Sequence, residues 1–368
     1  MKVLIVGEGS YIGESFVRFI NTEKLATDII ENIKNDNIDK LVNDIVGADL
    51  VSARARENNN DMAQPNAHQN HMLCGRTQGP PLQRTNTNTE QCGSMYGPGN
   101  DYMSNKSFTV HTVDSYDEWQ TTDFTQYDSI LMIAGIAHNP KADKALYYAV
   151  NRDLAIAVAR KAKSGGVGQF IYVSTMAVYG KTRGEITVKT IPNPHPVDHY
   201  GLSKYQAEEA LKNIYPTGLC IVRPPIVYGF ACPGNFSKLV KLARRMPIFP
   251  DISNKRSMIY ITNLCAFFAY AIENGLQGVH LPQNIEHVNT TALVREINKK
   301  TLTTRLFNPL IHVMRRFIVP LDKLFGNLYY AHDPLEEAYN IVGFEESIQK
   351  SLYQNHQNLL NAPKISSK

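Results

Sequence analysis

The first thirteen residues, MKVLIVGEGSYIG, constrain the fold of this chain more than any other segment. Residues 2–6 form an almost unbroken apolar run, which is typical of a strand buried on both faces of a parallel sheet. Gly7 permits a tight turn after that strand, and Gly13 lets the following helix pack closely against it. The free amides at the start of the helix suit the phosphates of a dinucleotide. The sequence therefore predicts an α/β fold with a doubly wound parallel sheet and a dinucleotide site at the glycine turn.

The spacing of the glycine turn departs from the usual fingerprint. It reads GxGxxxG rather than GxGxxG, so that either Gly9 or Ser10 must let the backbone approach a pyrophosphate. A glycine turn that joins a strand to a helix without any ligand remains the alternative for this motif taken alone.

Two later apolar runs predict further strands of the same sheet. The run DSILMIAGIAH (128–138) ends in Ala134 and Gly135, which are small enough for a dinucleotide to lie against the strand end. The run GQFIYVSTMAVYG (168–180) ends in the hydroxyls of Ser174 and Thr175. Strand ends of this kind are where doubly wound sheets bind their ligands.

The segment DHYGLSKYQAEEAL predicts an amphipathic helix that begins after Asp198 and ends near Tyr215. Residues four apart share a helix face, so Lys204 is expected beside the phenol of Tyr200. The helix dipole and the lysine charge both favour a phenolate, which predicts a lowered pKa for Tyr200 and a role as general base. A tyrosine and a lysine on an ordinary surface helix are the alternative, because the YxxxK pattern is short.

Taken in order, these motifs resemble the extended short-chain dehydrogenases/reductases of the NAD-dependent epimerase/dehydratase family. The resemblance covers the chain apart from one insertion, and it implies a Rossmann domain that binds NAD, a smaller C-terminal substrate-binding lobe and a nucleotide-sugar substrate. The matching segments are GEGSYIG (7–13), AGIAH (134–138), Asn151, STMAVYG (174–180), YGLSK (200–204), RPPIVYG (223–229) and RSMIYITN (256–263).

The resemblance also implies roles for single residues. Thr175, Tyr200 and Lys204 are expected to be catalytic, with Arg256 and Asn235 on the substrate diphosphate. Asp114 follows the predicted second strand, where a carboxylate accepts both ribose hydroxyls and favours NAD over NADP. The residues expected to bind the cofactor are Gly7, Ser10, Tyr11, Ile12, Gly13, Asp114, Asp123, Ala134, Gly135, Tyr200, Lys204 and Pro225.

Met176 and Ala177 bear on the type of reaction. Sugar-nucleotide 4,6-dehydratases carry Asp-Glu at these positions, which eliminate water, and this chain lacks both carboxylates. The resemblance therefore implies a UDP-hexose 4-epimerase that acts through a transient 4-keto sugar. A sugar-nucleotide reductase or dehydrogenase is the first alternative, and a non-catalytic NAD(H)-binding module is the second.

The amino-acid composition also limits the partners and the cellular location that are expected. With 368 residues, of which 43% are hydrophobic, the chain can bury a large core, and its net charge of +4 gives no reason to expect nucleic acid. The sequence shows neither a signal peptide nor an integral membrane segment, so a cytoplasmic location is expected. Five scattered cysteines fit reduced thiols. The resemblance leaves a homodimer open as an assembly.

One tract fits neither the fold nor the family. Residues from about 52 to 106 are rich in Asn, Gln, Gly, Pro and Thr without apolar periodicity, and they are expected to form a loop or a disordered insertion. The spacing of His68, His71, Cys74 and Cys92 suits zinc, but without a packed scaffold no metal is expected. The domains expected are a cofactor domain (1–230, interrupted by this tract), a mainly substrate-binding lobe (231–350) and a tail (351–368). Within the lobe, residues 308–330 predict an inward-facing amphipathic helix, with a membrane-surface helix as the alternative.

Overall fold

The computed structural model describes residues 1–7, 9–34, 90–92, 108–114, 117–137, 143–193, 198–306, 308 and 324–360. These residues are organised around a sheet with the strand order β11-β7-β5-β4-β1-β3-β2. Every neighbouring pair in it is parallel except β2 and β3. The strands are β1 (Lys2–Val6), β2 (Glu90–Cys92), β3 (Phe108–Val113), β4 (Ser129–Met132), β5 (Gln169–Val173), β7 (Leu219–Val222) and β11 (Gly278–His280).

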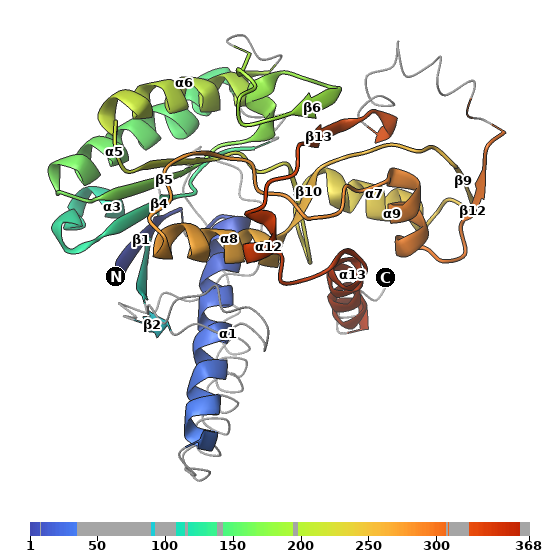
Figure 1. The fold of residues 1–368 in the computed structure, drawn as a ribbon, viewed down its shortest axis with the longest axis horizontal. Coiled ribbons are helices and arrows are strands. Elements are labelled where there is room, and N and C mark those ends of the chain that lie inside the picture. Colours follow the sequence, from blue (N-terminus) through green and yellow to red (C-terminus); the bar gives the residue numbers. More distant parts are fainter. Residues whose placement is uncertain are drawn as a thin grey trace, which may run out of the picture.

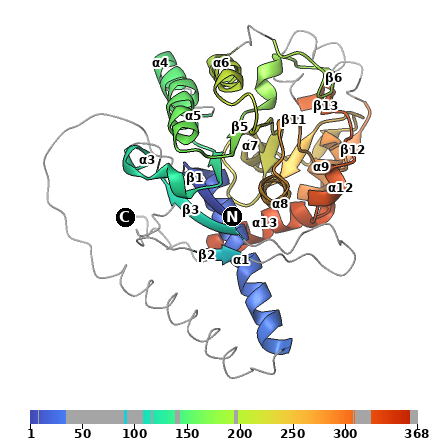
Figure 2. The same cartoon turned by 60° about the vertical axis from the view of Figure 1, so that its left-hand side comes forward.

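Helices cover both faces of the sheet, as Figures 1 and 2 show. On one face, α1 (Tyr11–Lys34) and α8 (Ile261–Glu273) pack together, with the rings of Phe16 and Phe268 edge to face. On the other face, α5 (Leu154–Ser164) and α6 (His199–Ile214) bury Val158 and Leu211 against the strands. Shorter elements connect these layers: α3 (Glu118–Thr121), η1 (Phe124–Gln126), α4 (Lys144–Tyr148), the π-helical turn η2 (Ala149–Asp153) and η3 (Met176–Tyr179).

The lobe is built from pairs of short parallel strands and several helices beside the carboxyl edge of the sheet (Figure 1). The strand pairs join β6 (Gly184–Ile186) with β13 (Leu328–Tyr330), β8 (Ile226–Tyr228) with β10 (Met258–Tyr260), and β9 (Ile248–Pro250) with β12 (Leu302–Thr304). The helices are α7 (Asn235–Ala243), α9 (Thr290–Ile297), α12 (Glu336–Tyr339) and α13 (Phe344–Leu360).

The predicted fold class is confirmed, since a mostly parallel sheet carries helices on both faces. One detail differs from expectation. Glu90–Cys92, inside the predicted insertion, pairs with β3 at the sheet edge because that edge offers free backbone groups. Most of the insertion, including His68, His71 and Cys74, lies outside the described residues.

The amphipathic segment 308–330 also lies largely outside the described residues, and its described end, Leu328–Tyr330, is a strand rather than a helix. Within the part of the chain that the structure describes, no helix combines the length and the apolar character needed to cross a membrane.

Candidate active site

The glycine turn lies at the carboxyl end of β1, where it meets the end of β4. Gly7 has a φ of 115°, a conformation that favours glycine, and a Cβ atom there would lie 2.6 Å from the backbone nitrogen of Ala134. The Gly7 amide donates to the carbonyl of Val113, the last residue of β3, at 3.0 Å. β1, β3 and β4 thus meet at Gly7 without room for a side chain. The turn therefore presents backbone atoms rather than a side chain at the carboxyl ends of these strands.

Ser10 acts as the N-cap of α1. Its hydroxyl accepts a hydrogen bond from the Gly13 amide at 3.0 Å, and its own amide donates to the Gly7 carbonyl at 3.1 Å. The serine that replaces a glycine in the fingerprint is therefore used to start the helix. Gly13 is buried, Ile12 packs against the core, and the phenol of Tyr11 donates to the Phe230 carbonyl at 3.0 Å.

The two aspartates expected near the adenosine occupy different positions. Asp114 directly follows β3, beside the glycine turn, as expected for a ribose-binding carboxylate, and its amide donates to Glu118 Oε2 at 3.2 Å. Asp123 is exposed and caps η1, where it accepts from the Thr125 amide and hydroxyl. These bonds lower the pKa of Asp123. Its predicted adenine contact stays a prediction.

Thr175 and Tyr200 meet at the end of β5. Asp198 caps α6 by accepting from the Gly201 amide at 2.7 Å, which places Tyr200 in the first turn of the helix, as the sequence predicts. The Tyr200 phenol and the Thr175 side chain are hydrogen-bonded to each other. The Thr175 hydroxyl also accepts from the Ala177 amide at 3.2 Å and so begins η3. A phenol and a hydroxyl therefore converge at a strand end.

Lys204 is buried one helical turn further along α6. Its ammonium donates to the Val173 carbonyl at 2.9 Å and lies 4.7 Å from the centroid of the Tyr172 ring. Burial lowers the pKa of Lys204 to about 7, and the nearby Glu208 carboxylate opposes that shift. A Cβ atom on Gly135 would lie 2.9 Å from the Lys204 nitrogen, so the predicted small residue leaves the ammonium in place.

The expectation of a lowered pKa for Tyr200 is wrong for this structure. Burial raises the pKa of the phenol, and Asp198 and Tyr147 add to the rise, whereas the hydrogen bond with Thr175 lowers it in part. The Lys204 ammonium donates to the Val173 carbonyl instead of acting on the phenol. Desolvation therefore outweighs the helix dipole and the lysine charge.

A buried ion pair beneath the hydroxyls was missed by the sequence analysis. The carboxylate of Glu208 accepts from Arg223 Nε at 3.0 Å and from Nη2 at 2.5 Å, and neither side chain is more than 2% exposed. Glu208 also accepts from the hydroxyl of Ser174, the neighbour of Thr175, and Arg223 donates to the Tyr179 hydroxyl at 2.8 Å. The sequence pattern that could have indicated a buried carboxylate here is the spacing of four between Lys204 and Glu208, which places both on one helix face.

Asn151 joins the loop after β4 to α6. It is buried within the π-helical turn η2, where its side chain accepts from the Ile136 amide at 2.7 Å and donates to the Ile136 carbonyl and the Ser203 hydroxyl. The Tyr172 hydroxyl donates to its backbone carbonyl at 2.8 Å. Asn151 thereby fixes the loop after β4 against the helix that carries Tyr200 and Lys204.

The remaining predicted residues lie along the lobe side of the site. Pro225 is half-buried between β7 and β8, next to Pro224, whose carbonyl accepts from the Met176 amide at 3.0 Å. Asn235 is the first residue of α7. Arg256 forms backbone bridges to Val288 and Leu328, and its guanidinium donates to the Gly326 carbonyl at 3.2 Å.

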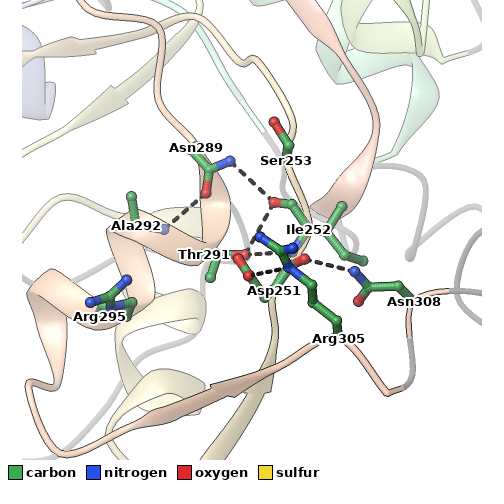
Figure 3. Close-up of a pocket in the computed structure, with 9 residues that line it drawn as sticks. All are labelled: Asp251, Ile252, Ser253, Asn289, Thr291, Ala292, Arg295, Arg305 and Asn308. Carbon is green, nitrogen blue, oxygen red and sulfur yellow. Dashed lines mark hydrogen bonds and ion pairs between the residues drawn. The ribbon is translucent and has the colours of Figure 1, made fainter.

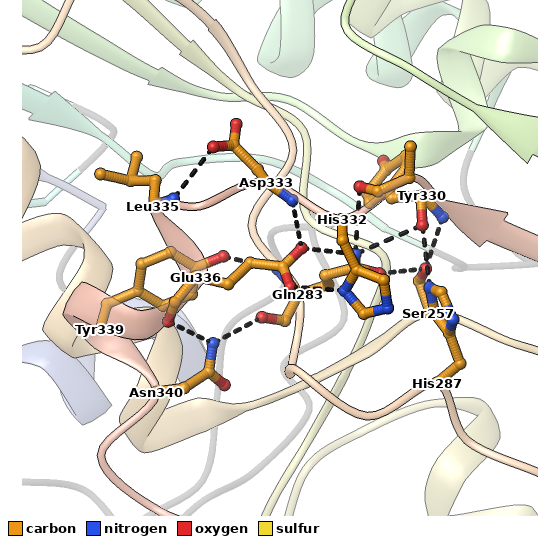
Figure 4. Close-up of polar contacts among 11 residues, drawn as sticks. Ser257, Gln283, His287, Tyr330, His332, Asp333, Leu335, Glu336, Tyr339 and Asn340 are labelled. Carbon is orange, nitrogen blue, oxygen red and sulfur yellow. Dashed lines mark hydrogen bonds and ion pairs between the residues drawn. The ribbon is translucent and has the colours of Figure 1, made fainter.

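Ser257, the residue after Arg256, belongs to a polar network of the lobe (Figure 4). The Gln283 amide group donates to Glu336 and to the carbonyl of Tyr330, and the Ser257 hydroxyl donates to Gln283 Oε1. The Tyr330 hydroxyl in turn donates to the Arg223 carbonyl at 2.8 Å. These bonds connect the expected diphosphate side of the lobe to the buried pair beneath Thr175.

A cavity of about 710 Å³ lies elsewhere in the lobe, between β9, β12 and the start of α9 (Figure 3). Arg305 and Asp251 form an ion pair at its wall, with 2.9 Å between Nε and Oδ2, while Asn289 caps α9. None of the three predicted catalytic residues lines this cavity.

Comparison with known proteins agrees with this geometry. The model of the NAD dependent epimerase/dehydratase family matches residues 3–285, which include the glycine turn, Thr175, Tyr200 and Lys204. The chain belongs to this family. Membership confirms the resemblance drawn from the sequence motifs and agrees with NAD as the expected cofactor.

Two curated relatives are epimerases. The chain is 30% identical over 217 residues to N-acetyl-alpha-D-glucosaminyl-diphospho-ditrans,octacis-undecaprenol 4-epimerase of Escherichia coli O157:H7, covering 55% of this chain and 65% of the relative. It is 34% identical over 161 residues to UDP-glucose 4-epimerase of Vibrio cholerae, covering 41% of this chain and 49% of the relative. The matched regions thus span less than two thirds of either relative.

Solved structures share the fold over nearly the whole chain. UDP-glucuronic acid 4-epimerase of Bacillus cereus, in complex with NAD, superposes with a TM-score of 0.55 at 15% identity and covers 97% of this chain and 99% of its own. A dTDP-4-dehydrorhamnose reductase of Clostridium acetobutylicum gives a TM-score of 0.57 at 14% identity, covering 97% and 100%. An epimerase and a reductase therefore share the architecture described above.

The contact between Gly135 and Lys204 predicts the effect of a single methyl group. In Gly135→Ala the new Cβ would lie 2.9 Å from the Lys204 nitrogen and 3.1 Å from Asn151 Oδ1, so the ammonium must move. We expect turnover and NAD affinity to fall at least about tenfold with little change in stability, because the displaced atom ends a flexible side chain. Isothermal titration with NAD and thermal unfolding measure the two effects. Gly343→Ala, where the methyl group meets nothing within 4 Å, is the control, and equal NAD affinity in both variants would refute the prediction.

Proposed function

We propose that this protein is an NAD-dependent nucleotide-sugar 4-epimerase, with a UDP-hexose as its substrate. The observation that carries the proposal is the hydrogen-bonded pair of Thr175 and Tyr200 at the end of β5, with Lys204 buried one turn away. The two curated relatives, both epimerases of sugars attached to a diphosphate, support the same reaction class.

The residues fit the cofactor. Gly7 and Gly135 occupy positions where a Cβ atom would meet Ala134 and Lys204, and Asp114 follows β3, the strand next to the glycine turn. The first turn of α1 and these strand ends would hold the dinucleotide, with Pro225 beside the nicotinamide. When bound, NAD accepts a hydride from the sugar and returns it.

The side chains of this chain supply the proton chemistry. Tyr200 takes the proton from the 4-hydroxyl of the sugar and returns it after the sugar has turned, while Thr175 hydrogen-bonds the same oxygen. Lys204, buried one turn further along α6, would bind the ribose of the cofactor. Arg256 and Asn235 would hold the diphosphate, since a guanidinium binds two oxygens at once.

Epimerisation is favoured over dehydration by the residues that follow Thr175. Met176 and Ala177 lie in η3, where the Ala177 amide donates to Thr175 and the Met176 side chain packs against the cluster around Tyr330. Neither residue offers an acid or base for removing water from C5 and C6. A sugar-nucleotide reductase remains the second candidate, as the fold shared with the Clostridium acetobutylicum reductase allows it.

A panel of UDP-hexoses with a free 4-hydroxyl distinguishes these reactions. We expect interconversion of 4-epimers without net consumption of NAD, measured by NMR of the sugar products. Accumulation of a 4-keto-6-deoxy sugar would establish a dehydratase instead. Stoichiometric oxidation or reduction of the nicotinamide would establish a dehydrogenase or reductase.

A further inference from the structure

The outer end of the lobe combines exposed apolar side chains with an excess of positive charge. We call this region the lobe tip and define it as residues 241–248 and 298–306. Figure 1 places the end of α7, β9 and β12, which contribute to it, at the opposite end of the molecule from α3 and α5. The two segments lie side by side, because Asn298 donates to the Ala243 carbonyl and the Leu302 amide donates to the Pro247 carbonyl.

Four apolar side chains of the lobe tip face solvent. Leu302 is 70% exposed and Leu306 is 79% exposed, while Ile248 and Leu242 are 48% and 43% exposed. Ile248 and Leu302 are register partners in the β9–β12 pair, so their side chains project from the same side of it. A single exposed leucine is ordinary in a folded protein, but a group of four on two adjacent segments indicates a surface that meets something apolar.

The charge of the lobe tip is of one sign. Its two segments contain no Asp or Glu and six exposed basic residues, namely Lys241, Arg244, Arg245, Lys299, Lys300 and Arg305. The acidic side chains paired with it are Glu296, bound to Lys299, and Asp251, bound to Arg305. Basic residues at the ends of α7 and α9 also complement the helix dipoles, but the dipoles give no reason to expose Leu302 and Leu306.

We propose that the lobe tip docks on a membrane surface that contains anionic phospholipids. Leucine side chains inserted at the boundary between headgroups and acyl chains, with lysine and arginine on the surrounding phosphates, form the arrangement by which peripheral proteins bind bilayers. The absence of acidic residues from both segments selects an anionic surface over a neutral one. The inference concerns a surface distinct from the Thr175–Tyr200 pair and holds whether or not the protein is an epimerase.

Vesicle co-sedimentation of the full chain tests the proposal. We expect binding to vesicles of phosphatidylcholine mixed with phosphatidylglycerol, weaker binding to phosphatidylcholine alone, and loss of binding as salt screens the charges. Leu302→Ser with Leu306→Ser should reduce the partition coefficient at least about tenfold, since less apolar area is inserted. Arg244→Gln with Lys299→Gln and Lys300→Gln should reduce it about fivefold for each charge removed.

A matched control separates the lobe tip from general surface chemistry. Ile191 is 84% exposed and Lys189 is also exposed, both on the loop after β6, so Ile191→Ser with Lys189→Gln removes similar groups elsewhere. This variant should bind vesicles like the wild type, and thermal unfolding should show that all variants are folded. Absence of wild-type binding, or equal losses in the control and the lobe-tip variants, would overturn the proposal. A wild-type dimer that the leucine substitutions dissociate would also overturn it, because the face would then join two copies of the chain.

Discussion

Replacing Tyr200 by phenylalanine is expected to lower turnover by about two orders of magnitude or more while the fold and cofactor binding persist. In the proposed mechanism the phenol exchanges the substrate proton, and loss of a general acid or base commonly costs about 10²–10⁴ in rate. The ring remains, so packing in the first turn of α6 is retained. Turnover of the UDP-hexose identified by NMR, together with NAD affinity by calorimetry, measures both effects.

Thr175→Val provides the companion measurement for Tyr200→Phe. Because Thr175 is hydrogen-bonded to the phenol and lowers its pKa in part, removing the hydroxyl should move the acidic limb of the pH–rate profile, along which the general base loses its proton, to higher pH. Wild-type turnover in Tyr200→Phe would show that the proton passes through another group. An unchanged pH profile in Thr175→Val would show that the hydroxyl does not act on the phenol.

Glu208→Ala is expected to destabilise the protein by about 3–5 kcal/mol, the range found when one partner of a buried ion pair is removed. The substitution would leave the Arg223 guanidinium, 2% exposed, without the carboxylate that now accepts two of its hydrogen bonds. Ser174, beside the proposed catalytic residue Thr175, would lose a partner as well. The midpoint of urea unfolding, followed by circular dichroism, measures the change.

The neighbouring residue offers a control for Glu208→Ala. Glu209 forms an ion pair with Lys212 on the same helix, but both side chains are nearly half exposed, so Glu209→Ala should cost about 1 kcal/mol or less. Replacing both buried partners, with Glu208→Leu and Arg223→Met, should recover part of the stability, because no charge then remains unpaired. Equal unfolding midpoints for Glu208→Ala and Glu209→Ala would show that the buried pair adds little.

The elements of the fold were predictable where local signals were strong. Asp198 marks the start of α6 and Pro216 its end, and the structure has the helix at His199–Ile214. The second strand, which was expected to end before Asp114, is present at Phe108–Val113. Strand β2 was not recognised, since Glu90–Cys92 is polar and acquires its conformation by pairing with β3.

Within the candidate site, residue positions were predicted more successfully than electrostatics. Thr175, Tyr200 and Lys204 come together at the end of β5, yet the pKa of Tyr200 is raised where a lowering was expected. The charge of Lys204 and the helix dipole are visible in a sequence, whereas the amount of water removed from a phenol depends on the whole fold. The Glu208–Arg223 pair was missed for a similar reason, because its partners are brought together by long-range packing.

The π-helical turn that carries Asn151 limits the deletions that this chain can accept during evolution. A π turn holds one residue more than an α-helical turn and costs stability, so such insertions are retained mainly where they serve a function. Here the extra residue sets the angle at which Asn151 faces the Ile136 backbone and Ser203. Deleting one residue between 149 and 153 would make the helix more regular and turn Asn151 away by about 100°. A deletion that makes the helix more regular would therefore remove the hydrogen bonds by which Asn151 connects the loop after β4 to α6.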